Sequence, residues 1–281
     1  MNATLSAAIQ GVANIAEAAT TSPIKRMPTI FVGHGSPMNA VESNEFTHRL
    51  EKWGKDIGRP ASILVISAHW LTQNEIKVAV QAHPKTIHDF GGFPQALFDV
   101  QYPAPGSPAL ADRVQELLSV PVVLEENEWG IDHGAWSVLK YMYPNADVPV
   151  VQLSLDGAMS AREHYELAKQ LRPLRDENIL ILSSGNVVHN LRTIHWQEGA
   201  EPYPWAKEFN DFFASEIRAN HHEALIDWER FGDAAHLSIP TAEHYWPALY
   251  TLALQEAGEQ AKIYTDGIEM SSIGMLGFSI Q

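Results

Sequence analysis

Four short apolar runs constrain the fold of this 281-residue chain more than any other feature. They are residues 29–32 (TIFV), 62–67 (SILVIS), 148–155 (VPVVQLSL) and 179–182 (ILIL). Each run is apolar on both faces, whereas a strand with one wet face alternates apolar and polar residues. Segments with helical spacing separate these runs, so strands alternate with helices along the chain. This pattern predicts an α/β protein with a central, mainly parallel or mixed sheet covered by helices on both faces.

The remaining elements fit the same alternation. We expect helices at 44–57, from Ser107-Pro108, from the capping box at 160–163, around 205–217 and at 241–257, and strands at 120–124, 262–265 and 276–280. No repeat, linker or low-complexity tract divides the chain. We therefore expect one catalytic domain over residues 27–281, preceded by a loosely ordered extension over residues 1–26 that lacks the basic start of a signal peptide.

Composition excludes several classes of protein. The chain has no cysteine, which rules out disulfides, thiolate metal sites and thiol nucleophiles. Its formal net charge of −15 argues against nucleic acid and anionic membranes as partners. No apolar run reaches the roughly 18–20 residues of a membrane span. These observations predict a cytoplasmic enzyme with small-molecule partners, and they leave a homo-oligomer open.

Histidine is the residue type that points to chemistry. Of the 13 histidines, five fall at element boundaries expected on one rim of the sheet: His34, His69, His133, His189 and His244. Imidazole suits iron, zinc, copper and nickel, and a cysteine-free chain must hold such a metal with histidines and carboxylates. Seven others are expected to be ordinary surface side chains: His48, His83, His164, His195, His221, His222 and His236. His88, in the Gly-rich loop 87–94, is a candidate substrate contact.

Other catalytic motifs are absent from the sequence. It contains no Walker loop, dinucleotide fingerprint, His-Glu-x-x-His or Gly-x-Ser-x-Gly elbow. Ser36 lies beside His34, which raises nucleophilic serine chemistry. The tight turn points the two side chains apart, and Pro37 makes Ser36 a helix-start residue instead.

Six motifs in register resemble one known family. They are GHGSPMNA (33–40), SAHW (67–70), IHDFGGFP (87–94), DHGAW (132–136), GNVVHNLR (185–192) and PTAEHYWPALY (240–250). Together they resemble the LigB-type class III extradiol ring-cleavage dioxygenases, and within that family the 4,5-DOPA extradiol dioxygenase branch. The resemblance runs from about residue 27 to the C-terminus.

The resemblance implies a non-haem Fe(II) centre that binds a catechol and O2 and opens the ring beside the two hydroxyls. His34 and His69 match the two histidine ligands, and His244 matches the third position. His189 matches a histidine close to the metal, as a further ligand or a base. His133 matches an active-site histidine, so His133 and His189 are the implied catalytic residues.

Two carboxylates bear on this site. Asp132 either orients its neighbour or caps a helix. Glu243 lies beside His244, and neighbours on a helix point about 100° apart, so only one can face the metal. We choose His244, which fits the DOPA branch. An all-nitrogen site also holds zinc well, so zinc is expected to replace iron in some purified samples.

Two other functions compete with this one. One is a zinc hydrolase that uses a metal-activated water, and the other is a metal-binding or ligand-binding protein without turnover. The intact set of five histidines argues against loss of turnover. The sequence leaves the physiological catechol open among DOPA, caffeate, protocatechuate and similar small catechols.

Overall fold

A computed structural model describes residues 26–197 and 199–281, so most of the predicted extension at 1–26 lies outside the described residues. Arg26, the last residue of that extension, contacts the folded body: its side chain pairs with Asp176 at 2.7 Å and with Glu256 at 2.6 Å. Within the described part of the chain, no helix is both long and apolar enough to cross a bilayer.

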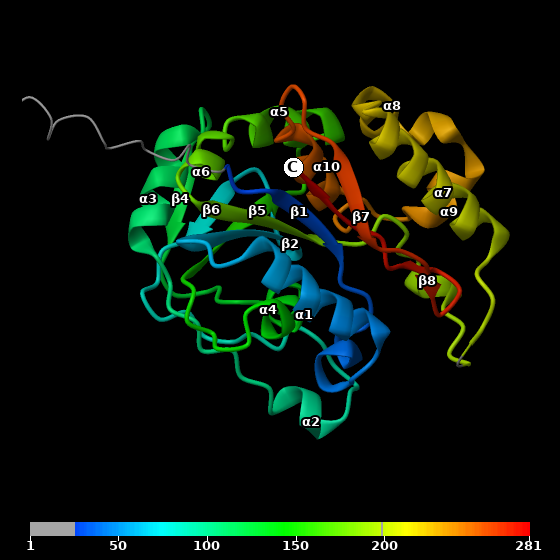
Figure 1. The fold of residues 1–281 in the computed structure, drawn as a ribbon, viewed down its shortest axis with the longest axis horizontal. Helices are drawn as coiled ribbons and strands as arrows, with labels where there is room; N and C mark the ends of the chain where they lie inside the picture. The colour runs from blue at the N-terminus through cyan, green and yellow to red at the C-terminus, as the bar shows by residue number, and fades with distance from the viewer. Residues whose placement is uncertain (1–25, 198) are drawn as a thin grey trace, which may run out of the picture.

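An eight-stranded mixed sheet forms the centre of the molecule (Figure 1). Its order is β4-β3-β5-β2-β6-β1-β10-β7. The strands are β1 (Thr29–Gly33), β2 (Ser62–Thr72), β3 (Ile76–Ala79), β4 (Val122–Glu125), β5 (Val150–Asp156), β6 (Ile179–Gly185), β7 (Ala261–Thr265) and β10 (Gly277–Ile280). The central four, β5-β2-β6-β1, are parallel to one another. They coincide with the four apolar runs, as the sequence predicts.

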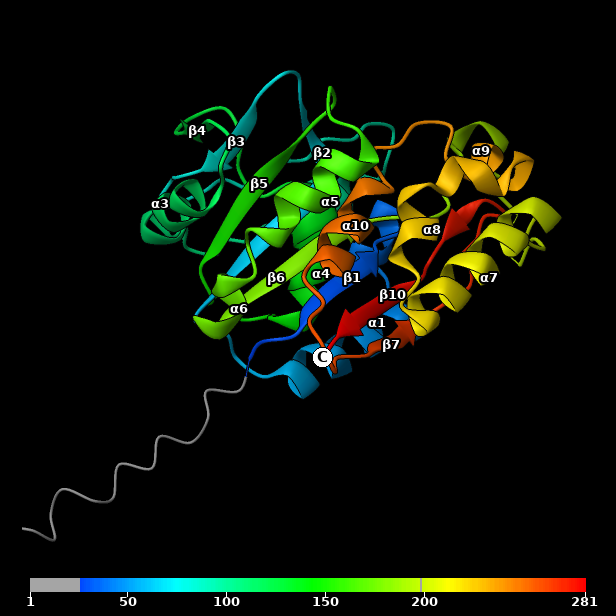
Figure 2. The same ribbon diagram turned by 90° about the horizontal axis from the view of Figure 1, so that it is seen from above.

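Helices cover both faces of this sheet (Figures 1 and 2). On one face lie α1 (Glu45–Ile57) and α4 (His133–Met142), and on the other α5 (Ala161–Lys169) and α10 (Trp246–Ala253). The other helices are α2 (Gln95–Phe98), α3 (Pro108–Leu117), α6 (Pro173–Asp176), α7 (Pro204–Ala219), α8 (His222–Ile226) and α9 (Asp233–Ser238). A short hairpin of β8 (Ile268–Glu269) and β9 (Ile273–Gly274) lies outside the main sheet.

Strand β2 shows why the central strands are apolar on both faces. Its side chains alternate between two cores, because Leu64 and Ile66 pack in one while Ile63 and Val65 pack in the other. Successive strand residues point to opposite faces, so a strand with helices on both sides needs an apolar residue at every position. The predicted α/β fold is confirmed.

The structure corrects four details of the sequence prediction. Strand β2 continues to Thr72, so His69 lies within a strand instead of after one. The last helix begins at Trp246, and His244 lies in the turn before it. His164 was predicted to be a surface side chain, and this is wrong: it is fully buried, and its ring packs on Trp246 with 4.5 Å between centroids. Strand β3 was not predicted, because it has only four residues and Lys77 interrupts its apolar pattern.

Candidate metal centre

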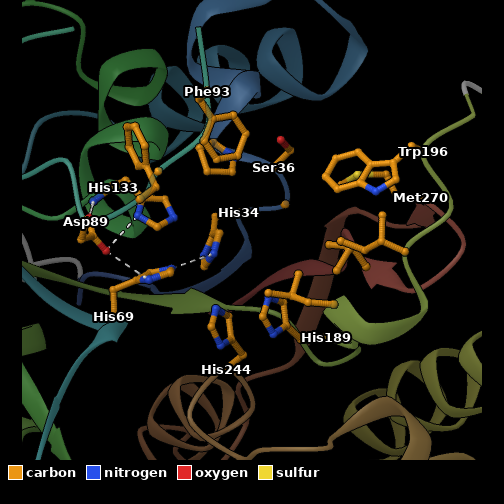
Figure 3. Close-up of a pocket in the computed structure, with 17 residues that line it drawn as sticks. His34, Ser36, His69, Asp89, Phe93, His133, His189, Trp196, His244 and Met270 are labelled. Carbon is orange, nitrogen blue, oxygen red and sulfur yellow. Dashed lines mark hydrogen bonds and ion pairs between the residues drawn. The ribbon is translucent and has the colours of Figure 1, made fainter. Parts of the chain in front are cut away.

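His34 follows the end of β1, at the carboxyl end of the parallel strands. Its backbone N–H donates to the carbonyl of Gly185, at the end of neighbouring β6, over 3.1 Å. Gly35, the next residue, has a φ of 65°, a conformation that glycine adopts without strain. The tight turn directs the buried His34 ring toward His69, as Figure 3 shows.

His69 reaches the same point from an irregular stretch of β2. The register of β2 against β5 shifts between Ile66 and Leu71. Such an irregularity changes the direction in which side chains leave a strand. The Nε2 atoms of His69 and His34 lie 3.2 Å apart.

His244 approaches from the turn before α10. Its carbonyl accepts the backbone N–H of Asn186 at 2.8 Å, which ties this turn to the end of β6. His34, His69 and His244 each offer a ring nitrogen, and these three atoms all lie within 4.8 Å of one another. One ion with ligand bonds of about 2.0–2.1 Å requires nitrogens separated by a little over 3 Å, which matches the 3.2 Å between His34 and His69.

Each of these rings has its other nitrogen tied to an oxygen. The Ser184 hydroxyl donates to the carbonyl of Gly134 at 2.6 Å, so its oxygen accepts the Nδ1–H of His34 at 2.9 Å. The Nδ1–H of His244 donates to Glu243 at 3.0 Å. Nδ1 of His69 lies 3.2 Å from Asp89 Oδ2. The proton is thereby placed on Nδ1, and Nε2 presents a lone pair to the centre.

The unprotonated nitrogens show that this donor set fits a cation. Nε2 of His244 is buried without a hydrogen-bond partner among the described residues. Two lone pairs 3.2 Å apart, on His34 and His69, repel each other unless a positive charge lies between them. The residues present therefore fit a divalent metal held by neutral imidazoles.

The electrostatics of the site keep the imidazoles neutral. Burial, reinforced by the neighbouring rings, holds the pKa of His34 and of His244 well below the ordinary histidine value. Burial also lowers the pKa of His189 to about 4. Metal ligands must be deprotonated, so the site is ready to bind a cation at neutral pH.

His133 lies beside the metal set without joining it. It is the first residue of α4, and its ring centroid is 3.8 Å from that of His69. Its Nδ1 lies 2.9 Å from Asp89 Oδ2, the same oxygen that His69 approaches. Burial and then the nearby His69 lower the pKa of His133, although Asp89 opposes this. The ring lines the cavity (Figure 3), and its catalytic role stays a prediction.

His189 stacks on His244, with ring centroids 3.5 Å apart and planes 8° from parallel. It joins a possible ligand set with Glu243 and His244, and not with His34 and His69. Its assignment as a metal ligand stays a prediction. Glu243 lies behind His244, against the Nδ1 that points away from the centre. Neither residue is in a helix, so the argument from helix geometry does not apply to them.

Asp132 is buried, caps the N-terminus of α4 and accepts several hydrogen bonds. Its carboxylate accepts the backbone N–H of Ala135 at 3.1 Å and side-chain donors from Ser67 at 2.8 Å and Gln152 at 2.7 Å. The cap alternative therefore holds. The sequence analysis missed Asp89, which contacts His133. Asp89 lies within the IHDFGGFP motif, but its neighbour His88 was taken as the candidate substrate contact.

The cavity above the histidines has a volume of about 430 Å³. Apolar side chains form most of its wall: Phe90, Phe93, Leu191, Ile194, Trp196, Met270 and Ile273. His88 does not line the cavity. Its Nε2–H instead donates to the carbonyl of Val100 at 2.9 Å. Ser36 reaches the cavity, and its oxygen accepts the N–H of Met38 at 3.2 Å as a helix cap. The volume and the aromatic lining suit a small aromatic molecule.

Comparison with known families decides the class of protein. Residues 27–275 match the family described as the catalytic LigB subunit of aromatic ring-opening dioxygenase. The chain belongs to the LigB family. As a LigB protein it is an aromatic ring-opening dioxygenase acting with O2, and the zinc hydrolase alternative is not favoured.

Individual LigB relatives are similar over most of their length. The chain is 48% identical to the 4,5-DOPA dioxygenase extradiol of Escherichia coli K12, over 91% of this chain and 95% of the relative. It is 38% identical to the protein of the same name from Beta vulgaris, over 83% and 88%. A crystal structure of an uncharacterized Escherichia coli K12 protein superposes with a TM-score of 0.80 at 42% identity, covering 91% of this chain and 100% of that chain. These relatives place the LigB enzyme among the extradiol dioxygenases.

Proposed function

We propose that this enzyme opens the ring of a small, DOPA-like catechol, with an Fe(II) ion held by His34, His69 and His244. One observation carries the proposal: three imidazole nitrogens converge while the opposite nitrogens are tied to Ser184, Asp89 and Glu243. The bound ion would supply open positions for both catechol oxygens and for O2. The names of the similar enzymes support the choice of substrate.

His189 is proposed to act beside this centre, either as a further ligand of the ion or as a base. Its ring lies flat against His244, and no described side chain is hydrogen-bonded to it. Its nitrogens are therefore free to bind the ion or to exchange a proton with a ligand of the ion. The low pKa that burial gives His189, about 4, keeps it an acceptor at neutral pH.

His133 is proposed as the residue that moves the substrate proton. With its Nδ1 facing Asp89, the Nε2 is left to face the cavity as an acceptor. A catechol hydroxyl must lose its proton to bind as the catecholate, and a neutral imidazole within reach accepts it. Phe90, whose ring meets His133 edge-on at 5.3 Å, closes the other side of this position and excludes water from it.

The cavity wall positions the aromatic ring. Phe93 and Trp196 lie on opposite sides of its mouth in Figure 3, and both belong to the lining. We propose that the catechol ring enters between these two walls with its hydroxyls toward the histidines. Offset aromatic contacts of this kind contribute about 0.5–1.5 kcal/mol each.

Metal content and oxygen uptake test this function together. The enzyme, stripped of metal and reloaded with Fe(II) under anaerobic conditions, is expected to consume one O2 per catechol molecule. The Zn(II)-loaded enzyme is expected to bind the catechol without consuming O2, because zinc has no redox chemistry. A panel of DOPA, caffeate and protocatechuate ranks the substrates. Equal oxygen uptake with the Fe(II) and Zn(II) forms, or none with any catechol, contradicts the proposal.

A further inference from the structure

Asp89 faces two histidines with one oxygen. Its Oδ2 lies 3.2 Å from Nδ1 of His69 and 2.9 Å from Nδ1 of His133. Its Oδ1 accepts the backbone N–H of His133 at 2.9 Å. The side chain is only 14% exposed, so water competes little for these contacts. The two ring contacts are charge contacts and not well-aligned hydrogen bonds, and the Nδ1 of His133 has no other partner among the described residues.

The loop that carries Asp89 is held rigidly against α4. The backbone N–H of Ile87 donates to Ile131 at 2.8 Å, and the indole N–H of Trp136 donates back to Ile87 at 2.7 Å. These bonds tie Ile87, two residues before Asp89, to residues on both sides of the α4 N-terminus. The carboxylate is therefore fixed before any ligand arrives, which is what a positioning group requires.

The chemistry of a carboxylate decides which ring atoms can face it. An ionised carboxylate has only acceptor atoms, so it requires an N–H from each ring that faces it.

We propose that Asp89 is a positioning residue that fixes His69 and His133 as Nδ1–H tautomers through one shared oxygen. It thereby presents Nε2 of His69 to the metal and Nε2 of His133 to the substrate. Metal binding and proton transfer then depend on the same carboxylate. The inference rests on the proposed function for the role of His133, but the tautomer it assigns to each ring does not.

The variant Asp89→Asn replaces one atom. The amide oxygen can still accept the His133 backbone N–H, which preserves this bond to the first residue of α4. The amide NH2 then takes the position of Oδ2 and presents a donor to both rings. Each ring must lose its Nδ1–H or turn away.

Two variants serve as controls. Glu243→Gln replaces the charged acceptor behind His244 by a neutral amide, at a contact of 3.0 Å, and leaves Asp89 in place. Asp99→Asn removes an exposed carboxylate further along the same connection, one that accepts only from Gln95 at 2.9 Å. The first control changes a carboxylate that serves one histidine, for comparison with Asp89, which serves two. The second control measures the effect of losing a surface negative charge alone.

The test is 15N–1H NMR of histidine-labelled, metal-free enzyme, together with Zn(II) affinity by chelator competition. In the wild type, His69 and His133 are both expected to show the Nδ1–H tautomer. In Asp89→Asn both signals change, and Zn(II) affinity falls about 10–100-fold, the usual effect of removing a carboxylate behind a histidine ligand. Glu243→Gln is expected to lower the affinity similarly while the His133 signal stays. Asp99→Asn is expected to match the wild type.

Oxygen uptake at saturating Fe(II) supplies the second readout. Asp89→Asn is expected to lose about 10²-fold or more in kcat, as an acid–base group held in the wrong tautomer does. An Nε2–H tautomer for either ring in the wild type overturns the proposal. So does a change confined to one ring in Asp89→Asn. If the wild type binds Zn(II) yet consumes no O2 with any catechol, the proposed function fails, and the NMR result still decides the role of Asp89.

Discussion

Replacing Gly185 by alanine is expected to displace His244 without touching its side chain. Gly185 ends β6, and a Cβ built there would lie 2.2 Å from the carbonyl oxygen of His244. That carbonyl cannot turn away freely, because it accepts the N–H of Asn186 at 2.8 Å. The new methyl group therefore pushes the turn that carries His244 away from the end of the sheet.

The magnitude follows from the size of this overlap. Carbon and oxygen need about 1 Å more than the available 2.2 Å to reach ordinary van der Waals contact. Forcing an extra methyl into packed surroundings costs about 1–3 kcal/mol of unfolding free energy. Metal sites tolerate errors of only about 0.2 Å in ligand distance, so a shift near 1 Å is large. We expect metal affinity to fall by about 10–100-fold, the range found when the support of a ligand is lost.

The assay compares urea unfolding of the metal-free enzyme with chelator competition for Zn(II). Gly91→Ala is the matched control, because a Cβ at Gly91 meets no heavy atom within 4 Å. The control is expected to keep both the unfolding free energy and the metal affinity of the wild type. If Gly185→Ala is destabilised but binds Zn(II) like the wild type, His244 is not a ligand whose position matters, and the reasoning is refuted.

Three further predictions concern other parts of the chain. His133→Ala should keep its metal and lose about 10²–10⁴-fold in rate, whereas His69→Ala should lose metal and activity together. Metal analysis and oxygen uptake distinguish the two variants, and a fully active His133→Ala enzyme would remove His133 from the mechanism. Deleting residues 1–25, which leaves the ion pairs of Arg26 in place, should leave kcat unchanged, and a large loss in the folded truncation contradicts this. Burial lowers the pKa of His164 to about 4 in the folded state, so its contribution to stability is complete above about pH 6.5 and is lost as the pH falls from there toward 4. Over that window the unfolding free energy of the wild type should fall by about 3 kcal/mol more than that of His164→Gln, and equal pH profiles in urea unfolding would contradict the assignment.

The parallel strands and the first histidine were predictable because the pattern that marks them is local. A run such as 62–67, with four consecutive apolar residues between two serines, has few stable arrangements other than a strand covered on both faces. Once β1 is placed, the glycines at 33 and 35 end it and fix His34 at the carboxyl end of the sheet. Ligand sites of open α/β sheets occur at this end, so position alone pointed to His34.

The turn around His244 was not predictable from periodicity. Residues 241–257 have apolar side chains at helical spacing, and the pattern continues without interruption through the true start of the helix at Trp246. Tertiary contacts instead delay the start of the helix: the carbonyl of His244 bonds to Asn186, and the N–H of His189 bonds to Ser238. Contacts between segments more than 45 residues apart leave no mark on a local pattern, and tertiary contacts routinely override local preference.

The carboxylate partners explain why the set of histidines was easier to find than its chemistry. A histidine that binds metal is marked by its residue type, but the group that fixes its tautomer can be any oxygen within about 3 Å. Here the three partners are a serine hydroxyl, a loop aspartate and the glutamate next in sequence to its histidine. Only Glu243 is close in sequence, and it was weighed there as a rival ligand. In the structure, Glu243 accepts the Nδ1–H of His244 and thereby leaves the Nε2 of His244 unprotonated. The carboxylate that the sequence analysis treated as a competing ligand therefore prepares His244 to bind the metal.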